Sequence, residues 1–230
     1  MTWGYYSGVT RSFFGAANSK NISQRGNNLM LMLQEERKDD PTRPLIFVAH
    51  SLGGLVVKAA LSISKQSTRQ PWKRNIYLST TGIIFLGTPH GGSGVADWGL
   101  IASNLTRLAM QGAWARAPKG LTPNDEPLED LRKTFMKLLE EGHFRIHSFY
   151  ETLPITGISG LHGLVVPHEF ASVGHEKKET SLGIHGTHDS ICKFGATSDP
   201  GYQAVLCALQ DYVNGAVSDS QYANLPKAEP

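Results

Sequence analysis

The sequence predicts an α/β fold in which helices cover both faces of a mostly parallel sheet. Residues 45–49 and 82–86 are continuously apolar, which is typical of parallel strands that are buried on both faces. Between them, residues 52–63 carry apolar side chains at helical spacing. Because strands that alternate with helices form mainly parallel sheets, this order of elements predicts the fold class.

Further elements continue this alternation. Apolar residues within 29–33 predict a helix before the first strand. Residues 143–150 and 163–166 predict a third and a fourth strand. An apolar stripe predicts a last helix that begins at Pro200 and ends at Gly215.

The chain is predicted to hold one domain and a tail. We expect the domain to span residues 1–215 and a disordered tail to span residues 216–230, which are small and polar. The long connection at about 94–142 has two interpretations, a crossover helix with a decorated loop or a helical cap over a site. Its length favours the cap, since most connections in α/β units are far shorter.

Composition excludes several classes of protein. Lys and Arg total 22 and Asp and Glu total 20, for a net charge of +2, so charge predicts no nucleic-acid or membrane-surface partner. The two cysteines, Cys192 and Cys207, exclude a disulfide scaffold and predict an intracellular, cytoplasmic protein. We expect no signal peptide and no transmembrane segment, because neither pattern occurs in the sequence.

The turn after the first strand carries a candidate nucleophile. Residues 49–54 read AHSLGG, and a serine between small residues at a strand-to-helix turn is typical of a nucleophile elbow. Ser51 is therefore the candidate nucleophile, with Gly53 expected to be small for steric reasons. The alternative is a serine that only caps the helix. The Leu52 N–H and the helix dipole would stabilise an oxyanion, and His50 and His90 are candidate oxyanion or substrate-binding residues, although His90 could simply pack.

A serine nucleophile needs a histidine that accepts its proton and a carboxylate that orients the histidine. In such folds the three follow in the order serine, acid, histidine. His188 lies in a glycine-bearing loop before the last helix and is the preferred base, with His185 as the alternative. Glu151, just past the third strand, is the preferred acid. Glu169 is the alternative acid, and Asp189 is poorly placed to orient its neighbour.

These residues belong to blocks that resemble a known family. The blocks occur in the order AHSLGGLVVKAAL, GIIFLGTPHGGSGVADWG, HSFYETLP, GLVVPHEFASVG and HDSICKF. From about Thr2 to Val213, the chain resembles the lipase-like putative serine esterase domain of the serine-active-site-containing proteins. The resemblance implies an α/β-hydrolase fold, Ser51 as nucleophile, His188 as base and no metal or cofactor, and it supports Glu151 as acid.

The resemblance also points to a departure. Family members usually begin with a strand and a His-Gly loop that donates a second oxyanion N–H, and they reach a stretch like residues 2–6 only later. We therefore expect an amino-terminally shortened sheet, in which loops at Gly4 or Gly15 could substitute for the missing donor. In fungi such domains often join larger proteins, which implies a protein partner or further domains and leaves organelle or membrane association open.

Two functional hypotheses follow from the sequence. The first is a serine hydrolase that acts on carboxylic esters, with acyl or lipid esters as the small-molecule substrate. Its apolar acyl group is suggested by the bulky apolar segment at 94–142. The alternative is a catalytically weak recognition or interaction module of a larger signalling protein.

Overall fold

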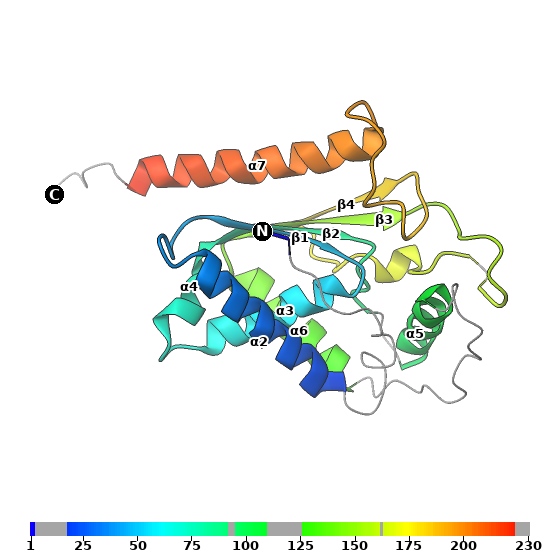
Figure 1. Ribbon diagram of the computed structural model, residues 1–230, viewed down its shortest axis with the longest axis horizontal. Coiled ribbons are helices and arrows are strands. Elements are labelled where there is room, and N and C mark those ends of the chain that lie inside the picture. Colours follow the sequence, from blue (N-terminus) through cyan, green and yellow to red (C-terminus); the bar gives the residue numbers. More distant parts are fainter. Residues whose placement is uncertain (3–17, 92–94, 110–125, 162, 224–230) are drawn as a thin grey trace.

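The centre of the fold is a sheet of four parallel strands, shown in the computed structural model of Figure 1. The structure describes residues 1–2, 18–91, 95–109, 126–161 and 163–223. In their order across the sheet, the strands are β1 (Leu45–His50), β2 (Thr80–Leu86), β3 (Arg145–Glu151) and β4 (Glu179–Ile184). Every neighbouring pair is parallel. The parallel α/β sheet predicted from the sequence is therefore confirmed.

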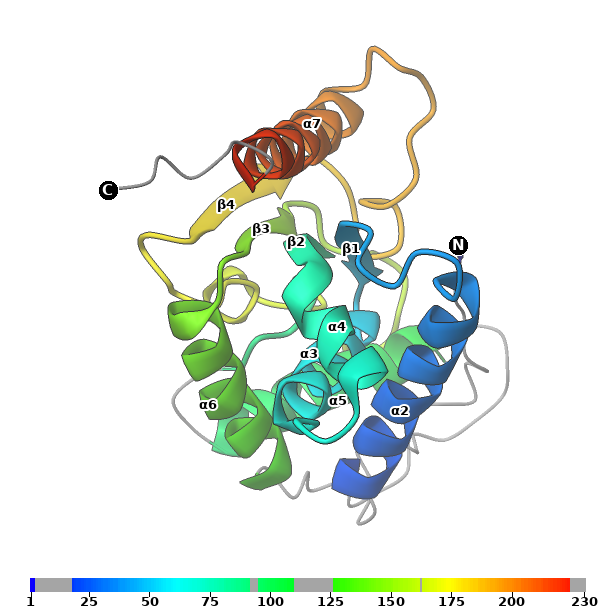
Figure 2. The same ribbon diagram turned by 90° about the vertical axis from the view of Figure 1, so that its left-hand side faces the viewer.

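Helices lie on both faces of this sheet. They are α2 (Asn18–Glu36), α3 (Gly53–Gln66), α4 (Pro71–Ser79), α5 (Val95–Ala109), α6 (Glu126–Glu141) and α7 (Pro200–Ala223), with a short 3-10 helix η1 (His168–Phe170). Figures 1 and 2 show α2, α3, α4 and α6 on one face and α7 alone on the other. The fold thus has three layers, with the sheet in the middle.

Apolar side chains fill both spaces between the layers. Phe47, Ile83 and Phe85 belong to the larger cluster on the side of α3 and α6. Ile84 and Tyr212 belong to the smaller cluster under α7. Because successive side chains of a strand point to opposite faces, a strand between two such layers is apolar throughout. This explains why residues 82–86 could be recognised as a strand.

The connection between β2 and β3 divides into two helices with different roles. α6 packs against α3, and its Phe135 and Leu138 are buried in the larger cluster, so α6 is the crossover helix. α5 lies near the carboxyl ends of the strands in Figure 1, where Asn104 Nδ2 donates to the Leu164 carbonyl at 3.2 Å. Of the helices expected in a cap, only α5 is in a position to cover that edge. Residues 94 and 110–125 of the predicted cap lie outside the described residues.

Two sequence predictions about boundaries are wrong. Residues 163–166 form no strand in the part of the chain that the structure describes, and the fourth strand is instead β4 (Glu179–Ile184). α7 continues through Gly215 to Ala223, because one glycine costs a helix only about 1 kcal/mol. Helix therefore occupies the first part of the predicted tail, and residues 224–230 lie outside the described part.

Candidate active site

Ser51 lies in a sharp turn between β1 and α3. Its φ is 54°, and it is the one residue other than glycine with a positive φ among the described residues. A side chain in this left-handed conformation costs on the order of 1–3 kcal/mol. The surroundings hold the turn in place, because the Ser51 N–H donates to the Leu86 carbonyl at 2.9 Å and the Thr88 hydroxyl donates to the Ser51 carbonyl at 2.9 Å. The geometry is that of the predicted elbow.

The steric reason for the small residues differs from the prediction. A Cβ added at Gly53 would meet no atom within 4 Å, so Gly53 is not required by crowding. A Cβ added at Gly54 would lie 2.3 Å from the Thr88 side chain. The tight contact in this turn is therefore at Gly54, one residue later than the motif suggested.

His188 stands directly against Ser51. Its Nε2 lies 2.9 Å from the Ser51 Oγ, and its side chain is only 1% exposed. The residue comes from the loop between β4 and α7, and a Cβ added at Gly87 would lie 3.0 Å from the imidazole ring. The loop after β2 thus leaves just enough room for the ring beside the serine.

Glu151 holds the other side of the same imidazole. Its Oε2 lies 2.6 Å from His188 Nδ1, and its Oε1 accepts the Val166 N–H at 2.9 Å. Glu151 is the last residue of β3 and is 1% exposed. Since a carboxylate only accepts, His188 Nδ1 carries the proton and Nε2 is free to accept the Ser51 hydroxyl proton. Three residues from three strand ends therefore form one chain of hydrogen bonds.

The alternative base and acids do not join this chain. His185, Glu169 and Asp189 are all exposed. Asp189 instead accepts a hydrogen bond from the Thr187 hydroxyl at 2.8 Å, which lowers the pKa of its carboxyl. Among the described residues, no hydrogen bond links any of the three to the serine hydroxyl or to the imidazole of His188.

Leu52 and His50 flank the serine. The Leu52 side chain is buried in the core, and the residue is the N-cap of α3, so its N–H lies at the positive end of that helix. His50 Nε2 lies 2.7 Å from the His188 carbonyl oxygen. Sequence reasoning missed that contact and also the Val166 N–H that binds Glu151. Neither had a local signal, because both join segments that are far apart in the chain.

His90 is buried in the core. Its ring packs edge-to-face on Phe85 with 4.8 Å between centroids. The backbone N–H of His90 donates to the Phe170 carbonyl at 2.6 Å. Neither ring nitrogen has a hydrogen-bond partner among the described residues. Burial, and then the charge of Lys58, lowers the pKa of His90 well below its usual value. The predicted substrate-binding role of His90 stays a prediction, and burial at 1% exposure does not favour it.

Lys58 is a buried cation in the second turn of α3. Its side chain is 1% exposed, and its Nζ lies 5.2 Å from the Phe135 ring centroid and 5.7 Å from that of Phe85. Burial lowers the pKa of Lys58 to about 7, and the carboxylate of Glu179 opposes that shift. Aromatic faces replace part of the lost hydration of an ammonium group. No sequence pattern marked this residue.

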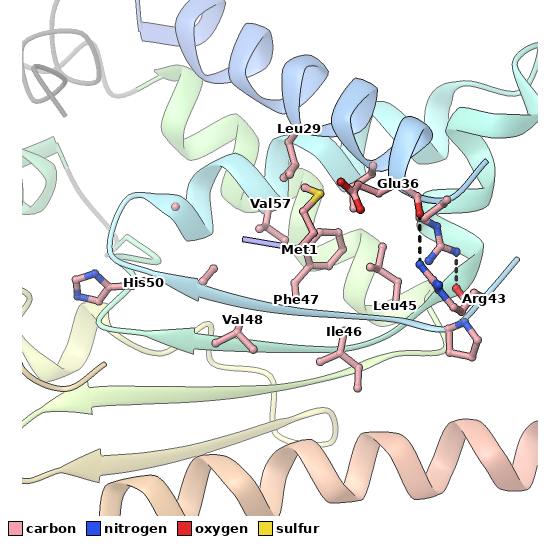
Figure 3. Close-up of a pocket in the computed structure, with 15 residues that line it drawn as sticks. Met1, Leu29, Glu36, Arg43, Leu45, Ile46, Phe47, Val48, His50 and Val57 are labelled. Carbon is pink, nitrogen blue, oxygen red and sulfur yellow. Dashed lines mark hydrogen bonds between the residues drawn. The ribbon is translucent and has the colours of Figure 1, made fainter. Parts of the chain in front are cut away.

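A cavity of about 560 Å³ borders the site along β1, the edge strand of the described sheet. Figure 3 shows it between β1 and α2, with Phe47 and Leu29 pointing into it. His50 stands at one end of the row of lining residues and Arg43 at the other. The lining includes His50 but not Ser51, so the cavity adjoins the serine turn without containing the hydroxyl.

Three other features complete the description of the site. Within the described ranges, no group of three or more His, Cys, Asp or Glu residues could hold a metal ion. No helix in those ranges is both long and apolar enough to cross a bilayer. Cys192 and Cys207 are free thiols.

Comparison with known proteins agrees with the site. Residues 16–117 match the model of a family described as Putative serine esterase (DUF676). The predicted resemblance to the serine esterases is confirmed. This resemblance supports a hydrolase-like function in the coarse sense, and it leaves the roles of the individual side chains and the substrate to be proposed.

Curated relatives that match this chain include several forms of one protein. The chain is 30% identical to Protein SERAC1 of Bos taurus over 84% of this chain and 27% of that protein. It is 31% identical to Protein SERAC1 of Homo sapiens over 76% of this chain and 24% of that protein. The chain therefore spans about a quarter of the length of these relatives.

A search of solved structures found the thioesterase domain of NocB in covalent complex with a fluorophosphonate nocardicin G analogue. The likeness has a TM-score of 0.37 and 11% sequence identity, and it covers 85% of this chain and 75% of that one.

Proposed function

We propose that this chain is a serine hydrolase that cleaves carboxylic esters. Ser51 is the nucleophile, His188 is the general base and acid, and Glu151 orients the base. The observation that supports this most is the continuous chain of hydrogen bonds, 2.9 Å from Ser51 Oγ to His188 Nε2 and 2.6 Å from His188 Nδ1 to Glu151 Oε2. The match to a serine esterase family supports the reaction class.

The first half of the reaction forms an acyl-enzyme. Ser51 Oγ attacks the ester carbon while its proton passes to His188 Nε2. The carbonyl oxygen becomes an oxyanion, which the Leu52 N–H and the amino end of α3 would stabilise. The imidazolium then gives its proton to the leaving alkoxide, so an alcohol departs. Glu151, buried and aligned, stabilises the transient positive charge on His188.

The second half returns the enzyme to its starting state. Water loses a proton to His188 Nε2 and attacks the acyl carbon. The tetrahedral intermediate collapses, the acid product leaves and Ser51 recovers its proton. No step in this cycle calls for a metal or a cofactor, because side chains supply every proton transfer.

The acyl or lipid part of the substrate has less support than the ester bond. It was predicted from the apolar residues of 94–142, and α6 uses its share of them in the core. α5 also buries Trp98, Ile101 and Leu105 in that cluster, and it leaves Leu100 half-exposed on its surface. Within this proposal, acyl or lipid esters are the narrower substrate class. Hydrolysis rates of p-nitrophenyl esters with short and long acyl chains test whether the chain prefers them.

The decisive experiment is labelling of the purified chain with a fluorophosphonate probe. We expect the parent chain to label, Ser51→Ala to lose labelling because the oxygen that bonds to the probe is gone, and His188→Ala to label more slowly by a factor of about 10⁶. Ser23→Ala, at an exposed serine of α2, and His185→Ala, at the exposed alternative base, are matched controls that should label like the parent. Loss of labelling in His185→Ala but not in His188→Ala would overturn the assignment of the base.

A recognition module is the second candidate. The observation that favours it is that the cavity of about 560 Å³ adjoins the serine turn but is not lined by Ser51, as a binding site separate from the nucleophile would be. This candidate predicts a cooperatively folding chain that neither reacts with the probe nor hydrolyses esters. The same labelling experiment, run with a thermal melt, therefore separates the two functions.

A further inference from the structure

His50 lies where β1 meets the loop that carries His188. Along β1, Phe47 and Ala49 are buried in the cluster on the α3 side, whereas Ile46 packs on the cluster under α7. Because side chains alternate along a strand, His50 points to the same face as Ile46. The His188 loop begins from β4 and leads to α7 on that face, and Figure 3 shows the His50 side chain at the carboxyl end of β1.

The contact between the two histidines fixes the tautomer of His50. Its Nε2 lies 2.7 Å from the carbonyl oxygen of His188. A carbonyl oxygen only accepts, so His50 Nε2 carries the proton and donates it. The two rings are tilted by 42° with centroids 5.1 Å apart, so they adjoin without stacking.

Backbone hydrogen bonds flank His188 in the loop that carries it. Before the histidine, the Leu153 N–H donates to the Gly186 carbonyl at 3.1 Å. After it, the Ser190 N–H closes a turn onto the Thr187 carbonyl at 3.0 Å. These bonds lie on either side of residue 188, whereas His50 binds the peptide group of His188 itself.

We propose that His50 is a positioning residue, whose Nε2–H holds the backbone of His188 so that the imidazole stays in line between Ser51 and Glu151. This inference rests on the proposed hydrolase function for its catalytic consequence, and it differs from the substrate-binding role that the sequence predicted for His50. Glu151 fixes the ring of the base, and His50 fixes the main chain that carries the ring. Together they leave the base little freedom to turn away from the nucleophile.

Electrostatics agree with this role. Burial lowers the pKa of His50 most, and the neighbouring His188 and Lys193 lower it further. The hydrogen bond to the His188 carbonyl and the charge of Glu151 raise this pKa, each by less than burial lowers it. A neutral His50 can donate from Nε2 and adds no positive charge beside His188. This matters because His188 itself becomes cationic when it takes the serine proton.

The test compares two substitutions of His50. His50→Gln keeps an N–H donor near the position of Nε2, whereas His50→Leu removes it. We expect the rate of fluorophosphonate labelling to fall about 10- to 100-fold in His50→Leu, since small misplacements of catalytic groups cost about that much. We expect His50→Gln to stay within a few-fold of the parent.

A matched control separates positioning from general stability. His147 is a half-buried histidine on β3, and its Nδ1 lies 2.7 Å from the Tyr212 hydroxyl. Among the described residues, no hydrogen bond joins it to His188. His147→Leu removes a strand histidine of similar burial and should leave labelling unchanged. Equal losses in His147→Leu and His50→Leu would overturn the proposal, as would equal losses in His50→Gln and His50→Leu.

A second measurement does not depend on activity. Proton NMR of the parent should show a downfield resonance for His188 Nδ1–H bound to Glu151. We expect this resonance to broaden or disappear through exchange in His50→Leu and to persist in His50→Gln. Persistence in His50→Leu overturns the positioning role. If the resonance is lost in His50→Leu and the parent does not react with the probe, the positioning role holds and the proposed hydrolase function is contradicted. Failure of the inference and failure of the proposed function can therefore be told apart.

Discussion

Two histidines in this molecule are equally buried and have opposite surroundings. His188 and His90 are each 1% exposed, and each lies in a loop that follows a strand. His188 has a hydroxyl at one ring nitrogen and a carboxylate at the other. His90 has no hydrogen-bond partner at either ring nitrogen among the described residues and rests on an aromatic ring.

Burial alone therefore does not mark a functional histidine. A buried imidazole can move a proton only if one nitrogen has a donor or acceptor to exchange with and the other is held in a fixed tautomer. His188 meets both conditions in the described structure. His90 meets neither, and its lowered pKa reflects desolvation and the nearby Lys58 charge. Substitutions at three buried positions test this contrast.

Of these substitutions, replacing Glu151 with glutamine should have the largest effect. An amide offers one oxygen where Glu151 uses two, for His188 Nδ1–H and the Val166 N–H, and it lacks the charge that stabilises an imidazolium. We expect the rate of ester hydrolysis or probe labelling to fall by about 10⁴. Glu169→Gln, at an exposed glutamate, is the control and should leave the rate of hydrolysis or labelling unchanged. A Glu151→Gln variant that reacts at the parental rate would show that His188 needs no carboxylate.

Lys58→Met should change stability in a manner that depends on pH. The pKa of Lys58 is lowered from 10.5 to about 7 in the folded chain, so between these values the unfolded state binds the extra proton. The free energy of unfolding therefore rises with pH through this window by up to about 1.4 kcal/mol per pH unit. Below pH 7 both states are protonated, and this cost of burial is fully present.

Urea unfolding of the whole chain between pH 6 and pH 10 measures this effect. We expect Lys58→Met to be more stable than the parent at pH 6 by a few kcal/mol and to lose the slope that the lysine contributes. Lys38→Met, at an exposed lysine, should keep the parental slope. Parallel pH profiles for the parent and Lys58→Met would contradict the burial of this ammonium group.

His90→Phe should have the smallest effect. Phenylalanine is similar in shape, and it removes two buried nitrogens that have no partner among the described residues, so we expect stability to be unchanged or raised by about 1 kcal/mol. Probe labelling should stay within a few-fold of the parent. A thermal melt and the labelling rate measure both. A large loss of labelling in a stable His90→Phe variant would place His90 in the chemistry and end the contrast with His188.

Much of the fold was predictable because the central strands are apolar on both faces. Residues 82–86 lie between two core clusters, so their continuous apolar run is that of a strand buried on both faces. β4 was missed because it has the opposite character: it is an edge strand, and residues 180–182 are exposed. Residues 163–166 misled the prediction, because Val165 and Val166 are buried without being in a strand.

The candidate site was predictable to the extent that it lies at strand ends. Ser51 and Glu151 each fall at the carboxyl end of a strand whose position the sequence indicated, and parallel strands bring such ends to one edge. The packing around the turn was not predictable. The crowding falls on Gly54 and not on Gly53 because Thr88, from another strand end, occupies the space. Contacts of this kind depend on the register between strands, which one sequence does not specify.

The backbone conformation of Ser51 affects which residues can replace it during evolution. Glycine adopts a φ of 54° without the strain of about 1 kcal/mol or more that any side chain brings there. A lineage selected only for the fold would therefore tend to accept glycine at position 51. Serine is retained at this position only under selection for its hydroxyl. Relatives that no longer use the hydroxyl are therefore expected to carry glycine there.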